Sequence, residues 1–90
     1  MKRYRKKPVI VEAWVVGSPD RPHWIDVALA NEDMFRFENH GGESFSMKNE
    51  HVEDGMIYAY PGELIIRGIK GELYVCAQDI FEASYEEVGE

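Results

Sequence analysis

Three side chains around one predicted hairpin have the chemistry to bind an anion: Arg67, Lys70 and Tyr74. Two cations beside an aromatic ring, next to glycines that let a ligand approach the backbone, suit a phosphate or a carboxylate. The same residues also have a purely structural interpretation. In that interpretation Arg67 pairs with Glu63 or Glu72, and Lys70 is a solvated residue at the tip of a turn.

Aromatic side chains form a second candidate set, because rings exposed on a sheet stack on bases or anchor protein interfaces. Tyr58 and Tyr60 alternate with Ile57 and Ala59, so the two tyrosines share one face of their predicted strand. We take Tyr58, Tyr60 and Trp14 as candidate ligand-binding residues. The alternative is a place in the core, which some of the large rings in so small a domain must occupy.

Neither a metal site nor a catalytic constellation is indicated by the spacing of the titratable residues. His23, His40 and His51 stand 17 and 11 residues apart, and Cys76 is the single cysteine. Metal ligands and nucleophile–base pairs need converging side chains, and a thiol on a packed strand is usually inert. The glycines do not follow the spacing of a phosphate-binding loop. We therefore predict no metal, no cofactor and no catalytic residue.

The charge is unevenly distributed along the chain. The formal net charge is −7, yet residues 1–7 hold five of the ten bases and no acid, which leaves −12 on residues 9–90. So acidic a body repels phosphate, which argues against general nucleic-acid binding. We call residues 1–7 the basic arm. It is expected to be a frayed, solubilising terminus or to pair with the protein's own acidic tail, with contact to phosphate or to an acidic partner as the alternative.

The hydrophobic pattern predicts one short helix and six or seven short strands. A β-branched run predicts a strand at about 8–16, and Pro22 followed by apolar residues at helical spacing predicts a helix at about 22–31. From residue 34 the period is two, with strands expected near 35–38, 43–48, 56–60, 64–67 and 72–76. Asp79 is expected to cap a single helical turn before a last strand near 81–88.

Short strands joined by glycine-containing turns are typical of an antiparallel meander. We therefore predict an α+β fold, mostly antiparallel, in which a bent sheet or a small, partly open barrel carries the one helix. Ninety residues make one domain spanning 1–90. The longest apolar runs are far too short to cross a membrane, and no signal peptide is evident, so a cytoplasmic location is expected.

Two stretches resemble a known family. Residues 61–85 read PGELIIRGIKGELYVCAQDIFEASY, and residues 5–13 read RKKPVIVEA. The first is similar to the C-terminal signature of a family of small phage and prophage proteins, and the second to that family's usual start. The chain departs from the signature at Glu63, Leu64 and Val75, where the family has Asp, an aromatic residue and Pro. The resemblance implies a phage or prophage origin and a small soluble accessory protein, but it carries no activity.

These observations lead us to expect a non-enzymatic binding module. It would sequester a small anionic ligand of nucleotide type or block a host protein, and it would form a homo-oligomer because a site in so small a domain tends to lie between subunits. The alternative is a structural or assembly protein of the virion that uses its aromatic residues as interface anchors. A third possibility is a small hydrolase of phosphoesters or nucleotides.

Overall fold

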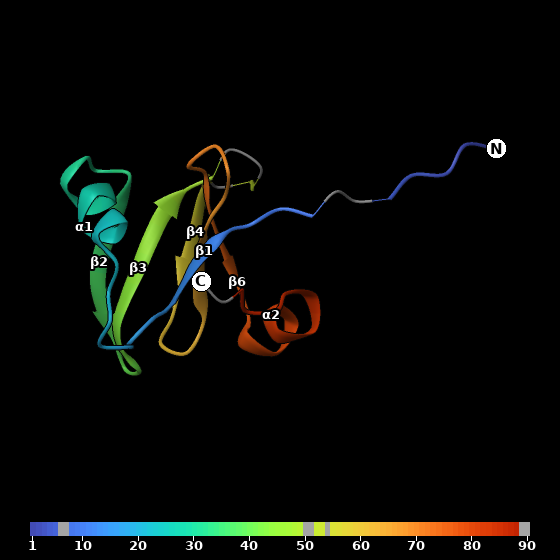
Figure 1. The fold of residues 1–90 in the computed structure, drawn as a ribbon. Helices are drawn as coiled ribbons and strands as arrows, with labels where there is room; N and C mark the ends of the chain where they lie inside the picture. The colour runs from blue at the N-terminus through green and yellow to red at the C-terminus, as the bar shows by residue number, and fades with distance from the viewer. Residues whose placement is uncertain (6–7, 50–51, 54, 89–90) are drawn as a thin grey trace.

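Two three-stranded antiparallel sheets form the fold of this protein, in a computed structural model that describes residues 1–5, 8–49, 52–53 and 55–88. The first sheet has the strand order β1-β5-β6, with β1 at Glu12–Val15, β5 at Leu64–Arg67 and β6 at Leu73–Cys76. The second has the order β2-β3-β4, with β2 at Met34–Asn39, β3 at Gly42–Lys48 and β4 at Met56–Ala59. The two sheets face each other across a shared core (Figure 1).

Helix α1, His23–Ala30, lies where the sequence predicts a helix. Pro22 precedes its first turn in an extended conformation, and Asn31 ends it by donating its backbone N–H to the carbonyl of Val27 at 2.9 Å. Ile25 and Ala28 are buried, since they point from one side of the helix into the core. An eight-residue helix is marginal alone, so this apolar contact is what holds it in place.

The second sheet is the predicted meander. Its first hairpin turns at His40 and Gly41, where the Asn39 side-chain oxygen accepts the Gly41 backbone N–H at 3.0 Å. The register pairs Phe37 with Ser44 and Phe35 with Ser46, and the next hairpin pairs Ser46 with Tyr58. Because residues paired across antiparallel strands share a face, these side chains all lie on one side of the sheet.

The first sheet joins segments that are distant in the chain. β1 pairs with β5 so that Glu12 lies opposite Arg67 and Trp14 opposite Ile65, and β6 returns beside β5 after a turn. The predicted turn at Pro61-Gly62 leads into β5. There Gly62 has φ +92°, which favours glycine, and the Glu63 N–H bonds the Tyr60 carbonyl at 3.0 Å.

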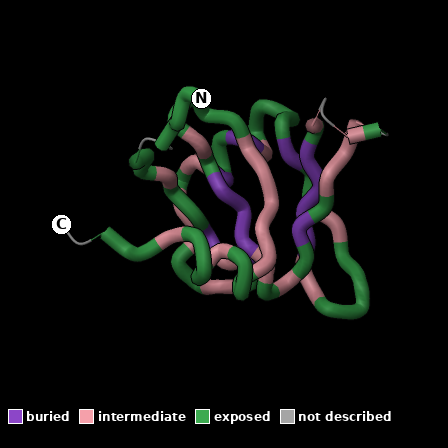
Figure 2. The backbone as a smooth tube through the Cα atoms, turned by 90° about the vertical axis from the view of Figure 1, so that its right-hand side faces the viewer, coloured by how far each residue is buried: buried purple, intermediate pink, exposed green. Residues whose placement is uncertain are grey.

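The core lies between the two sheets and is closed by α1, and the buried segments of the chain meet in it (Figure 2). Trp14 crosses from the first sheet to pack edge-on against Phe45 of the second, with ring centroids 5.6 Å apart. Phe45, Met47, Ala59 and Ile65 are each 0% exposed. At roughly 25 cal/mol per Å² of apolar surface, this layer is the main source of stability.

Two details of the predicted fold are wrong. The segment expected as a last strand near 81–88 instead holds the second half of helix α2, Gln78–Ser84, followed by a tail, residues 85–88, in which the structure describes no strand. Asp79 lies inside its first turn, and Ala77 is the cap residue. Phe81 and Tyr85 stack at 4.7 Å, a spacing of four residues that favours a helical turn over a strand. The second detail is the barrel: the six strands form two three-stranded sheets and no closed barrel, whereas the bent sheet, the other predicted form, is compatible with this arrangement.

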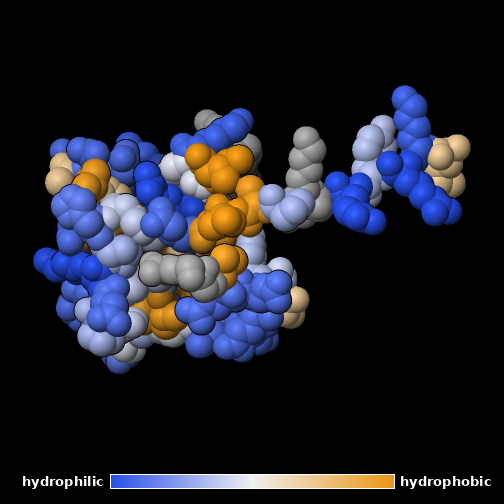
Figure 3. Space-filling view, in the orientation of Figure 1, coloured by the Kyte–Doolittle hydropathy of each residue, from blue (hydrophilic) through white to orange (hydrophobic). Residues whose placement is uncertain are grey.

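Residues 1–5 of the basic arm stand away from the body (Figure 1). Residues 1–5 are exposed and have no secondary structure, while the expectations for Lys6 and Lys7 fall outside the described residues. Figure 1 shows the N-terminus far from both sheets, and Figure 3 shows hydrophilic residues along the arm. No helix among the described residues is both long enough and apolar enough to cross a membrane.

Candidate functional site: an aromatic sheet face

The outer face of the second sheet presents aromatic rings to solvent. Phe35 and Phe37 lie on β2, and Tyr58 and Tyr60 lie on or directly after β4. Phe35, Tyr58 and Tyr60 are 41%, 44% and 42% exposed, large fractions for such rings. We call the surface formed by Phe35, Phe37, Ser44, Ser46, Tyr58 and Tyr60 the aromatic face.

Small residues on the central strand allow the rings to meet. Ser44 and Ser46 of β3 lie between the two aromatic rows, so nothing bulky holds the rows apart. Phe37 packs edge-to-face against Tyr58 at 6.1 Å and against Tyr60 at 6.2 Å, centroid to centroid. These are favourable aromatic geometries. Phe37, Tyr58 and Tyr60 therefore form one continuous surface.

The serines beneath the rings are buried but satisfied. Ser44 is 0% exposed, and its hydroxyl donates toward the Asn39 side-chain oxygen at 3.4 Å or the Gly42 carbonyl at 3.2 Å. Ser46 is 8% exposed. Among the described residues, no buried side-chain polar atom lacks a hydrogen-bond partner. The aromatic face is thus a preformed surface over a satisfied polar floor.

Charge is sparse on the aromatic face. The strand register places Lys48 on it, next to the Ser46–Tyr58 pair and opposite Met56. The ion pairs of this sheet lie on its other side, where Glu43 of β3 pairs with Arg36 at 3.2 Å and with Arg21 at 3.9 Å. An exposed apolar surface with one cation at its margin is suited to contact with a macromolecule.

The predicted group of Arg67, Lys70 and Tyr74 is divided between two sides of the first sheet. Arg67 lies opposite Leu73 and Glu12, whereas Tyr74 lies opposite Ile66, on the other face. Arg67 donates to Glu12 at 2.9 Å, so the ion-pair interpretation holds with a partner other than Glu63 or Glu72.

The turn after β5 is also organised by its own side chains. The Glu72 carboxylate accepts the backbone N–H of Lys70 at 2.9 Å, and so occupies the place an anion would take there. The Lys70 side chain is exposed. The Glu63 carboxylate likewise bonds the Tyr60 N–H at 2.8 Å. The structure therefore brings no convergent cation pair to this hairpin.

Tyr74 is half-buried beside Tyr85, the residue that follows α2. Burial raises the pKa of Tyr74 from 10.0 to about 12, with further contributions from a hydrogen bond to Tyr85 and from the charges of Tyr85, Glu72 and Cys76. Each of these effects disfavours the phenolate. Tyr74 is therefore a neutral packing residue at ordinary pH, and it is remote from the aromatic face.

Trp14 belongs to the core. It is 5% exposed, and its indole N–H donates to the Ser18 carbonyl at 3.3 Å. It borders a polar hollow of about 390 Å³ in which Arg21 joins Asp26 and Glu43. Arg21 is thus committed to acidic side chains of the chain itself. Trp14 is therefore a core residue, which was the alternative to the ligand-binding role considered for it.

No group of three or more His, Cys, Asp or Glu side chains that could hold a metal ion occurs among the described residues. His51 lies outside them. His23 and His40 are exposed on separate elements, and Cys76 is half-buried on β6. No thiol–imidazole or metal chemistry is assembled in the described part of the chain.

Sequence reasoning identified Tyr58 and Tyr60 but not Phe35 and Phe37, which complete the aromatic face. The alternation of Phe35 and Phe37 with charged residues looks like a strand that turns its rings inward. The missing signal was the hairpin register, which pairs the two phenylalanines with serines and places them outside. Comparison of the chain with protein-family models, curated proteins and solved structures finds no match.

Proposed function

We propose that this protein is a non-enzymatic binding module that binds a partner protein through the aromatic face. The observation that carries the proposal is the exposure of Phe35, Tyr58 and Tyr60, each above 40%, on the sheet face that points away from the core. Isolated exposed rings are ordinary, but a contiguous group is typical of interaction surfaces. Tyrosine is also enriched among the residues that dominate binding energy at protein interfaces.

A protein partner is better supported than a small anionic ligand. Arg67 is paired with Glu12, and Lys70 lies in the β5–β6 turn of the first sheet rather than on the second sheet, which carries the aromatic face. The rings pack edge-to-face on one another and present a surface rather than a slot. The net charge of −7 opposes a phosphate-bearing ligand. On the resemblance to phage and prophage proteins, we infer that the partner is a bacterial host or virion protein.

The test uses one double variant and one matched control. Phe35→Ser with Tyr58→Ser removes two exposed rings from the aromatic face. Ile69→Ser removes an equally apolar residue, 69% exposed, from the turn after β5. Each immobilised protein is incubated with the same bacterial lysate, and the retained proteins are quantified by mass spectrometry. A candidate partner is then purified, and its affinity for all three proteins is measured by calorimetry.

The proposal expects a partner that wild type and Ile69→Ser bind equally and that the double variant binds at least about tenfold more weakly. Equal binding by all three proteins contradicts it. A thermal-shift series with nucleoside mono- and diphosphates accompanies the capture. Stabilisation of wild type that the double variant loses would replace the protein partner with a nucleotide ligand.

A further inference from the structure

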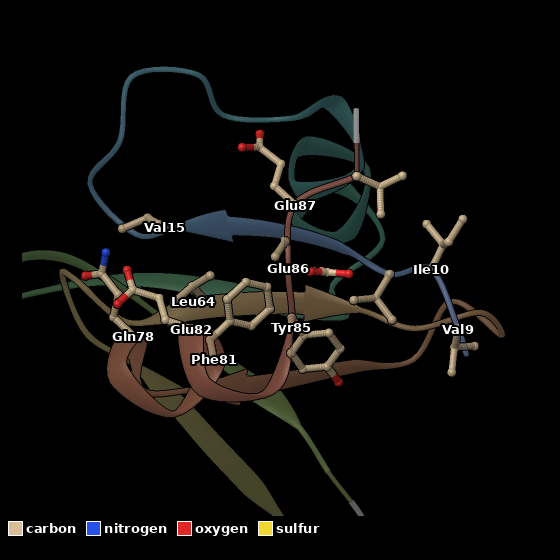
Figure 4. A pocket seen from close by; sticks show the side chains of 13 residues that line it. Val9, Ile10, Val15, Leu64, Gln78, Phe81, Glu82, Tyr85, Glu86 and Glu87 are labelled. Atoms are coloured by element: carbon tan, nitrogen blue, oxygen red, sulfur yellow. The ribbon is translucent and has the colours of Figure 1, made fainter. Parts of the chain in front are cut away.

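A groove of about 500 Å³ lies on the outer side of the first sheet. Ala13, Val15 and Leu64 contribute to its floor, and Phe81 and Tyr85 line the wall formed by α2 and the tail (Figure 4). Val9 and Ile10 line it at the end where the chain leaves for the basic arm. They are 43% and 73% exposed, so the groove carries apolar surface that the described chain does not cover.

The rim of the groove is acidic. Glu82, Glu86 and Glu87 line it, and all three are exposed. None takes part in the ion pairs found among the described residues. From residue 72 to residue 90 the sequence has six acids and no base. A segment that fills this groove should therefore be apolar and positively charged together.

The basic arm has that composition. Lys2, Arg3 and Arg5 flank Tyr4, which is 87% exposed, and the ion pairs among the described residues involve none of these bases. An aromatic ring for an apolar groove and three cations for an acidic rim make the two surfaces complementary. One molecule thus carries both complementary surfaces, the basic arm and the acidic groove, without bringing them into contact.

The direction of the chain indicates that a second copy brings the arm. From the groove end at Val9 and Ile10 the chain runs outward, away from the groove and from both sheets (Figures 1 and 3). To reach its own groove the arm would have to reverse direction immediately. Two copies related by a two-fold axis need no reversal, because each arm runs outward into the groove of its partner.

We propose that the protein forms a dimer in which each copy inserts the basic arm into the acidic, apolar groove of the other. Tyr4 packs beside Phe81 and Tyr85, while Lys2, Arg3 and Arg5 contact the glutamates of the rim. The exchange also covers Val9 and Ile10 in both copies. The surface used is separate from the aromatic face, so the dimer and the proposed partner interaction stand or fall independently.

The experiment is a charge exchange between two variants of the full chain. The arm variant carries Lys2→Glu, Arg3→Glu and Arg5→Glu, and the rim variant carries Glu82→Lys, Glu86→Lys and Glu87→Lys. All six residues are exposed, so folding is preserved, and circular dichroism confirms it. Asp20→Lys, Glu38→Lys and Glu53→Lys, exposed residues outside the groove, give a control with the same charge change as the rim variant. Light scattering and native mass spectrometry measure the mass at low salt.

Wild type and control are expected to be dimers that salt weakens. Each exchanged variant alone is expected to dimerise at least about tenfold more weakly, since arm and rim then carry the same sign. Their mixture should form heterodimers, because each arm meets a rim of opposite charge. A monomeric wild type, a dimer that the variants leave intact, or a mixture without heterodimers would each overturn the proposal.

Discussion

The outer faces of the two sheets both bury the side chains of their central strand, but they do so by different means. In the first sheet, Leu64 and Ile66 of the central strand β5 are 5% and 1% exposed on the outer side, where Leu64 lines the groove together with residues of α2 and the tail. In the second, Ser44 and Ser46 of the central strand β3 are 0% and 8% exposed although they lie on the side that faces away from the core. Their cover comes from the rings of the neighbouring strands.

This difference shows that a strand buried on both faces can have two causes. In β5, apolar side chains require another layer of structure. In β3, the serine side chains are too short to reach the surface and are covered by the larger rings of the neighbouring strands. These rings themselves remain available for binding. Accessible surface alone does not separate the two cases, whereas the size of the central residue and its cross-strand register do.

The largest expected effect comes from the two faces of β5. Ile65→Ala should lower the free energy of unfolding by about 2–5 kcal/mol, because Ile65 lies at the centre of the core, 0% exposed. Ile66→Ala should cost less, since α2 has no buried residue and can settle into the space. Urea unfolding of both variants measures the difference, and equal costs would show that α2 packs as rigidly as the second sheet.

On the second sheet, the contribution of the ring contacts to stability can be tested directly. Phe37→Leu should lower the free energy of unfolding by about 1–2 kcal/mol, because it removes ring contacts with Tyr58 and Tyr60 but leaves an apolar side chain in place. Phe35→Leu is the control, as no ring contact of Phe35 is found among the described residues. Similar costs for both would mean that the aromatic face is held by burial rather than by ring geometry.

The ionisation of Tyr74 measures how well the outer face of the first sheet is shielded from water. The unfolded chain ionises this phenol near 10.0 and the folded chain at about 12. The resulting stabilisation is complete below pH 10 and is lost as the pH rises to 12, because the unfolded state releases its proton first. Tyr74→Phe should flatten this part of the stability profile and remove the latest tyrosinate absorbance. A profile identical to that of wild type would place Tyr74 in water.

The smallest effect is expected at the Glu12–Arg67 pair, which joins the edge strand to the centre of the first sheet. Its side chains are 60% and 44% exposed and 2.9 Å apart, so the coupling should be about 0.2–1 kcal/mol and should fall with added salt. A double-mutant cycle with Glu12→Gln and Arg67→Gln measures it. A larger, salt-independent coupling would indicate that this end of the sheet is shielded by a bound partner.

Local features of the fold were predictable from the sequence. Pro22 and Asn31 bracket α1, Pro61-Gly62 makes the expected turn, and the period of two from residue 34 marks the strands of the meander. Each depends on neighbouring residues only. Tyr58 and Tyr60 were predictable as a shared exposed face for the same reason, since alternation along one strand needs no knowledge of its partners.

Features that depend on long-range pairing were not predictable in this way. Nothing local tells that β1 joins β5 rather than β2, or that Arg67 would find Glu12. Residues 81–88 were mistaken for a strand because their aromatic residues fit both the helical period and the strand period. The stacking of Phe81 on Tyr85 favours the helix. The acidic groove needs β1, α2 and the tail together, so no single stretch of sequence contains it.

The pairing of β1 with β5 also sets an order of events during synthesis. β2, β3 and β4 follow one another and can form hairpins as they emerge, whereas β1 waits for a partner 55 residues further along the chain. Until then the apolar run from Val9 to Val16 is an unpaired strand, the kind of segment that aggregates. Five bases in residues 2–7, just before this run, and Glu12 within it are charges of the kind that oppose the association of such segments.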